Sequence, residues 1–115
     1  MEISIVIPVL NEAERLGTLL PELNKRTQTD AVREIIVVDG GSEDKRAEVA
    51  GNNGARVLNA PKGRARQMNA GAHSARGDLL YFLHADSLPP AGFDRFILQA
   101  MEGGLQAGCF RLRFD

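Results

Sequence analysis

The chain has 115 residues, a formal net charge of −1 and one cysteine, Cys109. Its 43% hydrophobic and 25% charged residues are typical of a single soluble globular domain, and the near-zero net charge argues against a nucleic-acid partner. One cysteine permits no internal disulfide, and no apolar stretch reaches the roughly 20 residues of a membrane helix, so we expect a cytoplasmic protein.

The first predicted element is a strand from Ile3 to Val9, because this run is almost continuously apolar. Asn11 follows at the position of a helix N-cap, with Glu14 at the capping-box spacing. Four leucines then recur at helical spacing: Leu16, Leu19, Leu20 and Leu23. Pro21 is expected to kink or shorten this amphipathic helix near its end.

The middle of the chain alternates between further strands and helices. A second buried strand is predicted over 32–38, and Ser42 is expected to cap a short helix that ends near Ala50. A brief third strand over 55–58 precedes a helix over 64–75. That helix has a face of small or flexible residues expected against the sheet: Ala65, Met68, Ala72 and Ala75. A fourth strand is predicted over 79–83.

Two elements are predicted after the fourth strand. One is a helix whose apolar positions are Phe93, Phe96, Ile97, Ala100 and Met101. The other is a half-exposed strand in which Phe110, Leu112 and Phe114 alternate with arginines. Because the sequence ends on that strand, at Asp115, we expect a truncated domain or a homodimer that pairs through the strand.

This order of elements predicts an α/β fold: a three-layer, doubly wound, mainly parallel sheet with right-handed crossovers. Ligands bind such sheets at the carboxyl ends of the strands, where Glu12, Asp39 and Asp86 would gather. The turn after the first strand contains no glycine, so the dinucleotide-binding fingerprint is absent, and no P-loop sequence occurs. Both common phosphate-binding loops are therefore disfavoured.

Four blocks of sequence resemble a known family. They are SIVIPVLNE at 4–12, IIVVDGGSED at 35–44, GRARQMNAG at 63–71 and LYFLHAD at 80–86. In order and spacing these blocks resemble the family 2-type inverting glycosyltransferases, which have the nucleotide-diphospho-sugar transferase (A-type glycosyltransferase) fold. The sequence departs from the commonest pattern twice: Gly40 replaces a second aspartate, and His84 replaces the first aspartate of D-x-D.

The resemblance implies a set of nucleotide-binding residues: Pro8, Val9, Asn11, Glu12, Asp39, Arg64 and Gln67. Asp39 would accept a hydrogen bond from the nucleobase, although an ordinary Asx turn explains the same residue. Helix capping is the alternative explanation for Asn11 and Glu12. Arg64 and Gln67 open a helix, where a guanidinium group and a helix N-terminus suit a phosphate.

The resemblance also implies a divalent metal, Mn²⁺ or Mg²⁺, held by Asp86. Such an ion offsets the charge of a nucleoside-diphosphate leaving group, and one aspartate with substrate phosphates and water suffices to bind it. His84 would be a second ligand, which suits Mn²⁺ better than Mg²⁺. The alternative for His84 is a strand-end side chain directed into the sheet face.

The expected function is therefore transfer of a sugar from a nucleoside-diphosphate sugar to an acceptor that the sequence does not identify. Residues 1–115 would form the nucleotide-sugar-binding part. The acceptor-binding part and the general base are expected beyond Asp115, where contact with a membrane surface is also possible. Two alternatives stay open: a non-catalytic nucleotide-sugar-binding or structural module, and a nucleotidyltransferase of similar fold. The second requires a glycine- and arginine-rich loop after the first strand, which is absent.

Overall fold

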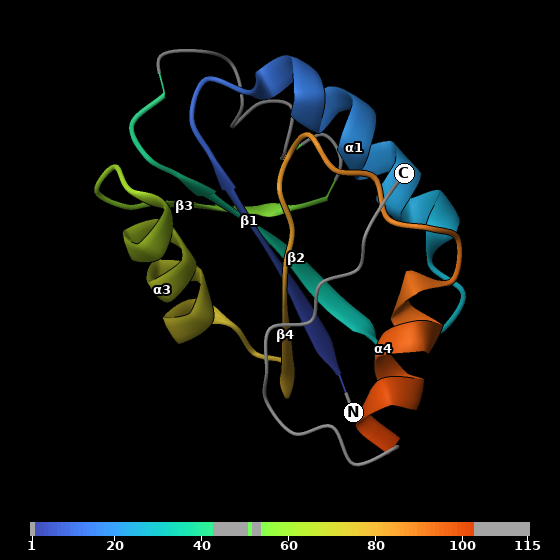
Figure 1. Ribbon diagram of the computed structural model, residues 1–115. Coiled ribbons are helices and arrows are strands. Elements are labelled where there is room, and N and C mark those ends of the chain that lie inside the picture. Colours follow the sequence, from blue (N-terminus) through green and yellow to red (C-terminus); the bar gives the residue numbers. More distant parts are fainter. Residues whose placement is uncertain (1, 43–50, 52–53, 103–115) are drawn as a thin grey trace.

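The computed structural model describes residues 2–42, 51 and 54–102, and the structural statements below concern these residues. A four-stranded parallel sheet of order β3-β2-β1-β4 forms the centre of the molecule (Figure 1). The strands are β1 (Ile3–Val9), β2 (Val32–Asp39), β3 (Arg56–Asn59) and β4 (Leu79–Phe82). The helices are α1 (Ala13–Arg26), α3 (Arg64–Ser74) and α4 (Phe93–Glu102). The predicted α/β architecture is confirmed.

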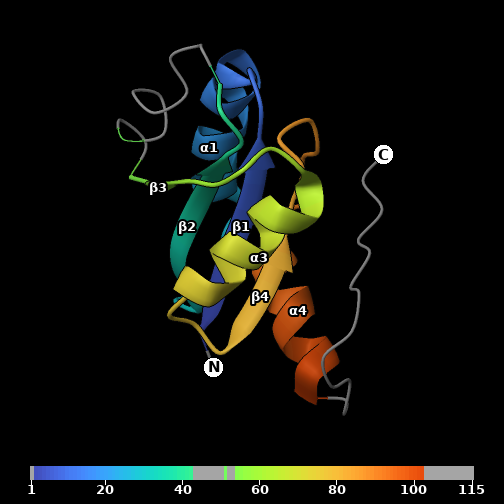
Figure 2. The same cartoon turned by 90° about the vertical axis from the view of Figure 1, so that its left-hand side faces the viewer.

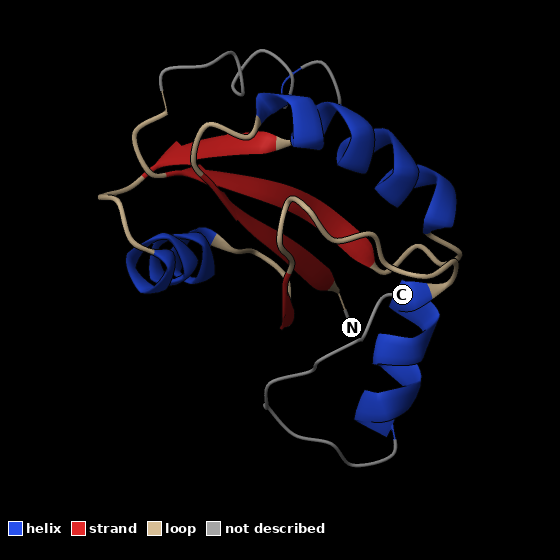
Figure 3. Ribbon diagram, turned by 45° about the horizontal axis from the view of Figure 1, so that its top comes forward, coloured by secondary structure: helices blue, strands red, loops and turns tan. Residues whose placement is uncertain are grey.

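Helices cover both faces of the sheet and give it three layers. Figures 2 and 3 show α3 on one face, with α1 and α4 on the other. The side chains of β1 alternate accordingly, so that Ile5 and Ile7 pack in the core beneath α1, whereas Val6 belongs to the smaller core beneath α3. Because β1 is central and buried on both faces, its sequence is apolar at nearly every position.

Helix α1 buries the predicted leucine stripe, and all four leucines are at most 3% exposed. The helix begins at Ala13, with Glu12 rather than Asn11 at the N-cap position. The capping-box prediction is therefore wrong: Asn11 has a φ of 52°, a left-handed conformation that asparagine tolerates better than most residues. Pro21 does not shorten the helix, which continues to Arg26.

Helix α3 packs mainly through residues other than those predicted, although the predicted Ala75, at its C-cap, packs against the smaller core. Gln67 and Gly71 are its buried residues, whereas Ala65 is exposed and Met68 is half-buried. A Cβ atom at Gly71 would lie 2.4 Å from Cγ1 of Val6, so the absent side chain allows the helix to lie directly on the sheet. The helix is close to the sheet as expected, but it approaches along a different face.

The other predicted elements have mixed outcomes. In α4, Phe93 and Ile97 are buried as expected, but Phe96 is 53% exposed. The segment 43–50, where a helix after Ser42 is predicted, and the predicted strand over 110–114 lie outside the described residues. Within the described part of the chain, no helix combines the length and the hydropathy needed to cross a bilayer.

Asp94 fixes the start of α4 to the connection between α1 and β2. It is completely buried and accepts hydrogen bonds from the backbone N–H groups of Gln28 and Thr29 and from the Thr29 hydroxyl. Burial alone raises the pKa of Asp94, but these hydrogen bonds outweigh it and hold the pKa below its ordinary value. The ionised carboxylate is thus the form that the fold stabilises.

A lowered folded-state pKa makes stability depend on pH with a definite sign. The contribution of Asp94 is complete above the ordinary pKa of 3.8 and is lost as the pH falls through the lower folded-state value. We expect Asp94→Asn to lower the free energy of unfolding at pH 7 by about 1.5–3 kcal/mol and to lose less stability on acidification than the parent. Urea denaturation at pH 7, 4 and 3 measures both effects. Asp30→Asn, an exposed change in the same connection, is the control, and equal acid sensitivity of parent and Asp94→Asn would contradict the assignment.

Candidate functional site

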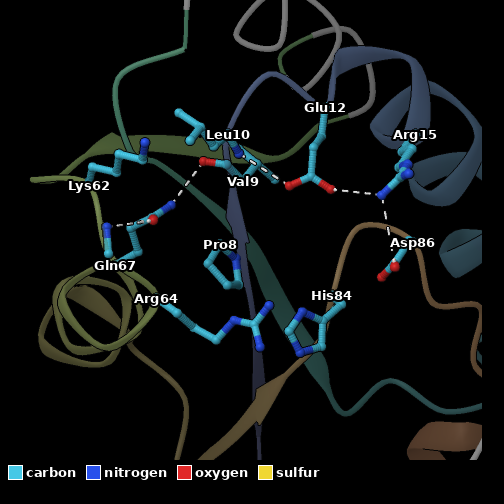
Figure 4. A pocket seen from close by; sticks show the side chains of 11 residues that line it. Pro8, Val9, Leu10, Glu12, Arg15, Lys62, Arg64, Gln67, His84 and Asp86 are labelled. Atoms are coloured by element: carbon cyan, nitrogen blue, oxygen red, sulfur yellow. Dashed lines mark hydrogen bonds and ion pairs between the residues drawn. The ribbon is translucent and has the colours of Figure 1, made fainter.

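A pocket of about 310 Å³ lies at the carboxyl edge of the sheet, where the strands end (Figure 4). It is lined by Pro8, Val9, Leu10, Glu12, Arg15, Lys62, Gly63, Arg64, Gln67, His84 and Asp86. The parallel strands bring the ends of β1 and β4 together at this edge, and α1 and α3 begin beside it. Every residue of the predicted site lines this pocket except Asn11 and Asp39.

Asp39 is buried, does not line the pocket, and organises the turn after β2. Asp39 is 1% exposed. Its carboxylate oxygens accept hydrogen bonds from the N–H groups of Gly41 and Ser42, each at 3.0 Å. The Ser42 hydroxyl donates to the same carboxylate and accepts the N–H of Asn11 at 2.7 Å. These bonds tie the turns after β1 and β2 together, so the Asx-turn interpretation of Asp39 is realised, and its contact with a nucleobase stays a prediction.

Gln67 joins three segments at the base of the pocket. Its side-chain amide donates hydrogen bonds of 2.9 Å to the carbonyl oxygens of Val9 and Val38, and its Oε1 accepts the N–H of Gly63. The residue is only 5% exposed, so most of its hydrogen-bonding capacity is used within the protein. A Cβ atom at Gly40 would lie 2.8 Å from this Oε1, so the glycine at position 40 leaves the space that Gln67 occupies.

The α1 side of the pocket carries a chain of charges. Glu12 accepts the N–H of Leu10 at 3.2 Å and lies 3.5 Å from a guanidinium nitrogen of Arg15. The same nitrogen is 3.9 Å from Oδ2 of Asp86 (Figure 4). Sequence reasoning missed Arg15, although its spacing of three residues from Glu12 on one helical turn is a recognised signal for an ion pair.

The α3 side of the pocket is basic. Arg64 opens α3, and Lys62 lies in the loop before it, so both cations stand beside the start of a helix. Gly63 has a φ of 139°, outside the range favoured by other residues, and its N–H bonds to Gln67. Two basic side chains at the N-terminal end of an eleven-residue helix provide a suitable environment for phosphate groups.

His84 and Asp86 follow β4 and line the same pocket, but they are directed differently. The His84 ring points away from the Asp86 carboxylate, toward the Arg64 side (Figure 4). Among the described residues, no group of three or more His, Cys, Asp or Glu side chains could hold a metal ion. A single exposed carboxylate nevertheless fits Mg²⁺ or Mn²⁺ when a bound diphosphate and water supply the other oxygens.

The pocket therefore combines a basic wall with a carboxylate wall at the carboxyl edge of a parallel sheet. Open α/β sheets bind their ligands at this edge. Cationic groups on one side and an exposed carboxylate on the other suit a phosphorylated ligand bridged to a divalent cation. The fold and the pocket thus define an α/β domain with a candidate ligand site at the carboxyl edge of its sheet.

The chain belongs to glycosyl transferase family 2, whose family model matches residues 4–113. It is 36% identical over 123 residues to the undecaprenyl-phosphate 4-deoxy-4-formamido-L-arabinose transferase of Pseudomonas aeruginosa (strain LESB58), which covers 95% of this chain and 35% of that protein. The protein of the same description from Proteus mirabilis (strain HI4320) is 38% identical over 89% of this chain and 34% of its own length. The chain thus spans about a third of these curated relatives.

Solved structures confirm the predicted nucleotide-diphospho-sugar transferase fold. Glucosyl-3-phosphoglycerate synthase from Mycobacterium tuberculosis, in complex with Mn²⁺, uridine diphosphate and glucosyl-3-phosphoglycerate, superposes with a TM-score of 0.74 at 25% identity, over 87% of this chain and 39% of that one. S. aureus TarS 1–349 in complex with UDP has a TM-score of 0.74 at 20% identity, over 90% of this chain and 32% of that one, and shows the fold alone.

Proposed function

We propose that this chain is the nucleotide-sugar-binding part of a glycosyltransferase that transfers a sugar from a nucleoside-diphosphate donor. The observation that carries the proposal is the pocket itself, which places Arg64 and Lys62 opposite the Asp86 carboxylate at the carboxyl edge of the sheet. Membership of the family supports the same function. The mycobacterial structure with Mn²⁺ and uridine diphosphate supports a metal-assisted diphosphate site in this fold.

Each wall of the pocket is assigned one task. Pro8 and Val9 contact the nucleoside, and the basic residues of the α3 side bind the phosphates. Asp86 holds the divalent cation, which would stabilise the negative charge of the departing diphosphate. His84 is assigned a lesser role, since its ring is directed toward the Arg64 side of the pocket. Gln67 is assigned a structural role, because its amide is already bonded to the strand ends.

The pocket has two carboxylates. Glu12 is assigned to the ion pair with Arg15, and Asp86, which also lies near Arg15, is assigned to the cation. We therefore place the general base, which must take the proton of the acceptor hydroxyl, outside this pocket. The acceptor, a homodimer, peripheral membrane contact and a cytoplasmic location stay predictions from the sequence. The alternative is a module that binds a nucleotide sugar without catalysis. An assay of sugar transfer distinguishes this module from an enzyme.

Calorimetric titration with uridine diphosphate and guanosine diphosphate, with and without Mn²⁺, tests the proposal. We expect Mn²⁺ to strengthen binding to the parent, and Asp86→Asn to remove most of this gain, an effect of about tenfold or more in affinity. His84→Ala should have a smaller effect. Asp78→Asn, an exposed change at the opposite end of β4, is the matched control.

The possible outcomes separate the parts of the proposal. A parent protein that binds neither nucleotide with Mn²⁺ present would refute the proposed function. A parent that binds a nucleotide, together with an Asp86→Asn variant that responds to Mn²⁺ as strongly as the parent, would refute only the metal assignment. Equal losses in Asp86→Asn and His84→Ala would make His84 a full ligand.

A further inference from the structure

Arg15 is a basic residue of the pocket at a position where helices favour acidic residues. It lies in the first turn of α1, where the helix dipole disfavours a positive charge. The side chain is 60% exposed and could extend into solvent, yet its guanidinium group stands between the carboxylates of Glu12 and Asp86. The two carboxylates therefore account for its position.

Arg15 also lies where two cavities meet. A second depression, of about 500 Å³, is lined by residues of α1 and of the loop after β4, and it shares Arg15 and Asp86 with the nucleotide pocket. An unbranched guanidinium side chain at this boundary can turn toward either cavity without disturbing the core, because it is largely exposed. The contact to Asp86 is thus easily exchanged for another anion.

The Asp86 carboxylate is the group assigned above to the divalent cation. A cation bound to this carboxylate would stand within a few ångströms of the Arg15 guanidinium, since Arg15 lies 3.9 Å from Oδ2. A divalent cation and a guanidinium group at about 4 Å repel each other by about 2 kcal/mol even in water. Cation binding is therefore weakened until Arg15 moves away or an additional anion neutralises both charges.

We propose that Arg15 is a positioning residue that makes the cation and the nucleoside diphosphate bind as a pair. Without nucleotide, Arg15 holds the Asp86 carboxylate and competes with the cation. When the diphosphate arrives, Arg15 turns to its oxygens and releases Asp86, so that this carboxylate becomes available to the cation. This inference rests on the proposed function, and it adds an order of events and a residue that the family resemblance did not provide.

The test measures binding of Mn²⁺ alone to the nucleotide-free protein, by the electron paramagnetic resonance signal of free Mn²⁺. We expect Arg15→Gln to bind Mn²⁺ about thirtyfold more tightly than the parent, since a repulsion of about 2 kcal/mol is removed. Arg15→Lys, which keeps the charge, should stay close to the parent. Arg33→Gln removes the charge of another exposed ion pair, with Glu2 at the opposite end of the sheet, and is the matched control.

A second titration measures uridine diphosphate with and without Mn²⁺. The factor by which nucleotide strengthens Mn²⁺ binding should be smaller in Arg15→Gln than in the parent, because the variant no longer penalises the cation in the absence of nucleotide. Unchanged or weaker Mn²⁺ binding by Arg15→Gln would overturn the inference. That result leaves the proposed function intact if the parent still binds uridine diphosphate in a Mn²⁺-dependent way.

Discussion

Replacing Gly71 with alanine is expected to lower the free energy of unfolding by about 1–3 kcal/mol. Alanine normally stabilises a helix interior relative to glycine, by up to about 1 kcal/mol, so the expected sign is opposite to the helix propensity. The reason is space: the new Cβ would lie 2.4 Å from Cγ1 of Val6 and 3.1 Å from Cγ2 of Val38. Both valines belong to the core beneath α3, so α3 must move outward from the sheet.

Gly17→Ala is the matched control for this prediction. Gly17 also lies inside a helix, α1, but on its exposed face. We expect this change to raise the free energy of unfolding by about 0.5–1 kcal/mol. Urea denaturation of the three proteins gives both values. If both alanine variants gained stability equally, α3 would not be packed as closely on the sheet as the distances indicate.

Displacement of α3 should also weaken nucleotide binding, because α3 carries Arg64 and the base of the pocket. Calorimetry on Gly71→Ala with uridine diphosphate, at a temperature where the variant is fully folded, therefore links the packing of the helix to the site. The Gly17→Ala control should bind as the parent does.

The sheet was predictable from the sequence because its strands are buried on both faces. The continuous apolar runs of β1 and β2 are typical of strands that are buried on both faces of a sheet. The leucine stripe between them indicates a helix, α1, that connects two parallel strands. The first turn of α1 was less predictable. Asn11 is a residue type favoured at N-caps, but here it has a left-handed backbone conformation, and its N–H bonds to Ser42, which is distant in sequence.

The location of the candidate site could be predicted from the strand order. The hydrogen-bond and ion-pair partners of its residues could not. Strand ends meet at one edge of a parallel sheet, so Glu12, Asp39 and Asp86 were expected to gather there; Glu12 and Asp86 line the pocket, whereas Asp39 does not. Local sequence cannot show that the Gln67 amide is bonded to Val9 and Val38, because those contacts join residues far apart in the chain. For the same reason the pairing of Arg15 with Asp86 emerged only in three dimensions.

Gln67→Glu is expected to cause a larger loss, of about 3–5 kcal/mol at pH 7, because an unpaired buried charge replaces a bonded amide. The substitution is nearly isosteric, but it exchanges two N–H donors for an acceptor. The new carboxylate oxygen would face the carbonyl oxygens of Val9 and Val38, each 2.9 Å from the present Nε2. Protonation of the new side chain restores one donor, so the variant should prefer its neutral form.

This preference predicts an inverted pH dependence. Burial beside two carbonyl oxygens raises the folded-state pKa of the introduced glutamate above its unfolded value of about 4.3. The deficit in the free energy of unfolding, relative to the parent, is therefore smallest below about pH 4.3 and grows as the pH rises through the folded-state pKa.

Two control variants separate charge from the loss of hydrogen bonds. Gln67→Met, which removes the donors without adding a charge, should show a smaller deficit that does not change with pH. Gln99→Glu places the same carboxylate on the exposed surface of α4 and should be neutral. Urea denaturation of the four proteins between pH 4 and pH 8 makes the comparison. A deficit in Gln67→Glu that is equal at both ends of this range would contradict the assigned hydrogen bonds, because a buried carboxylate held against two carbonyl oxygens must gain stability by taking up a proton.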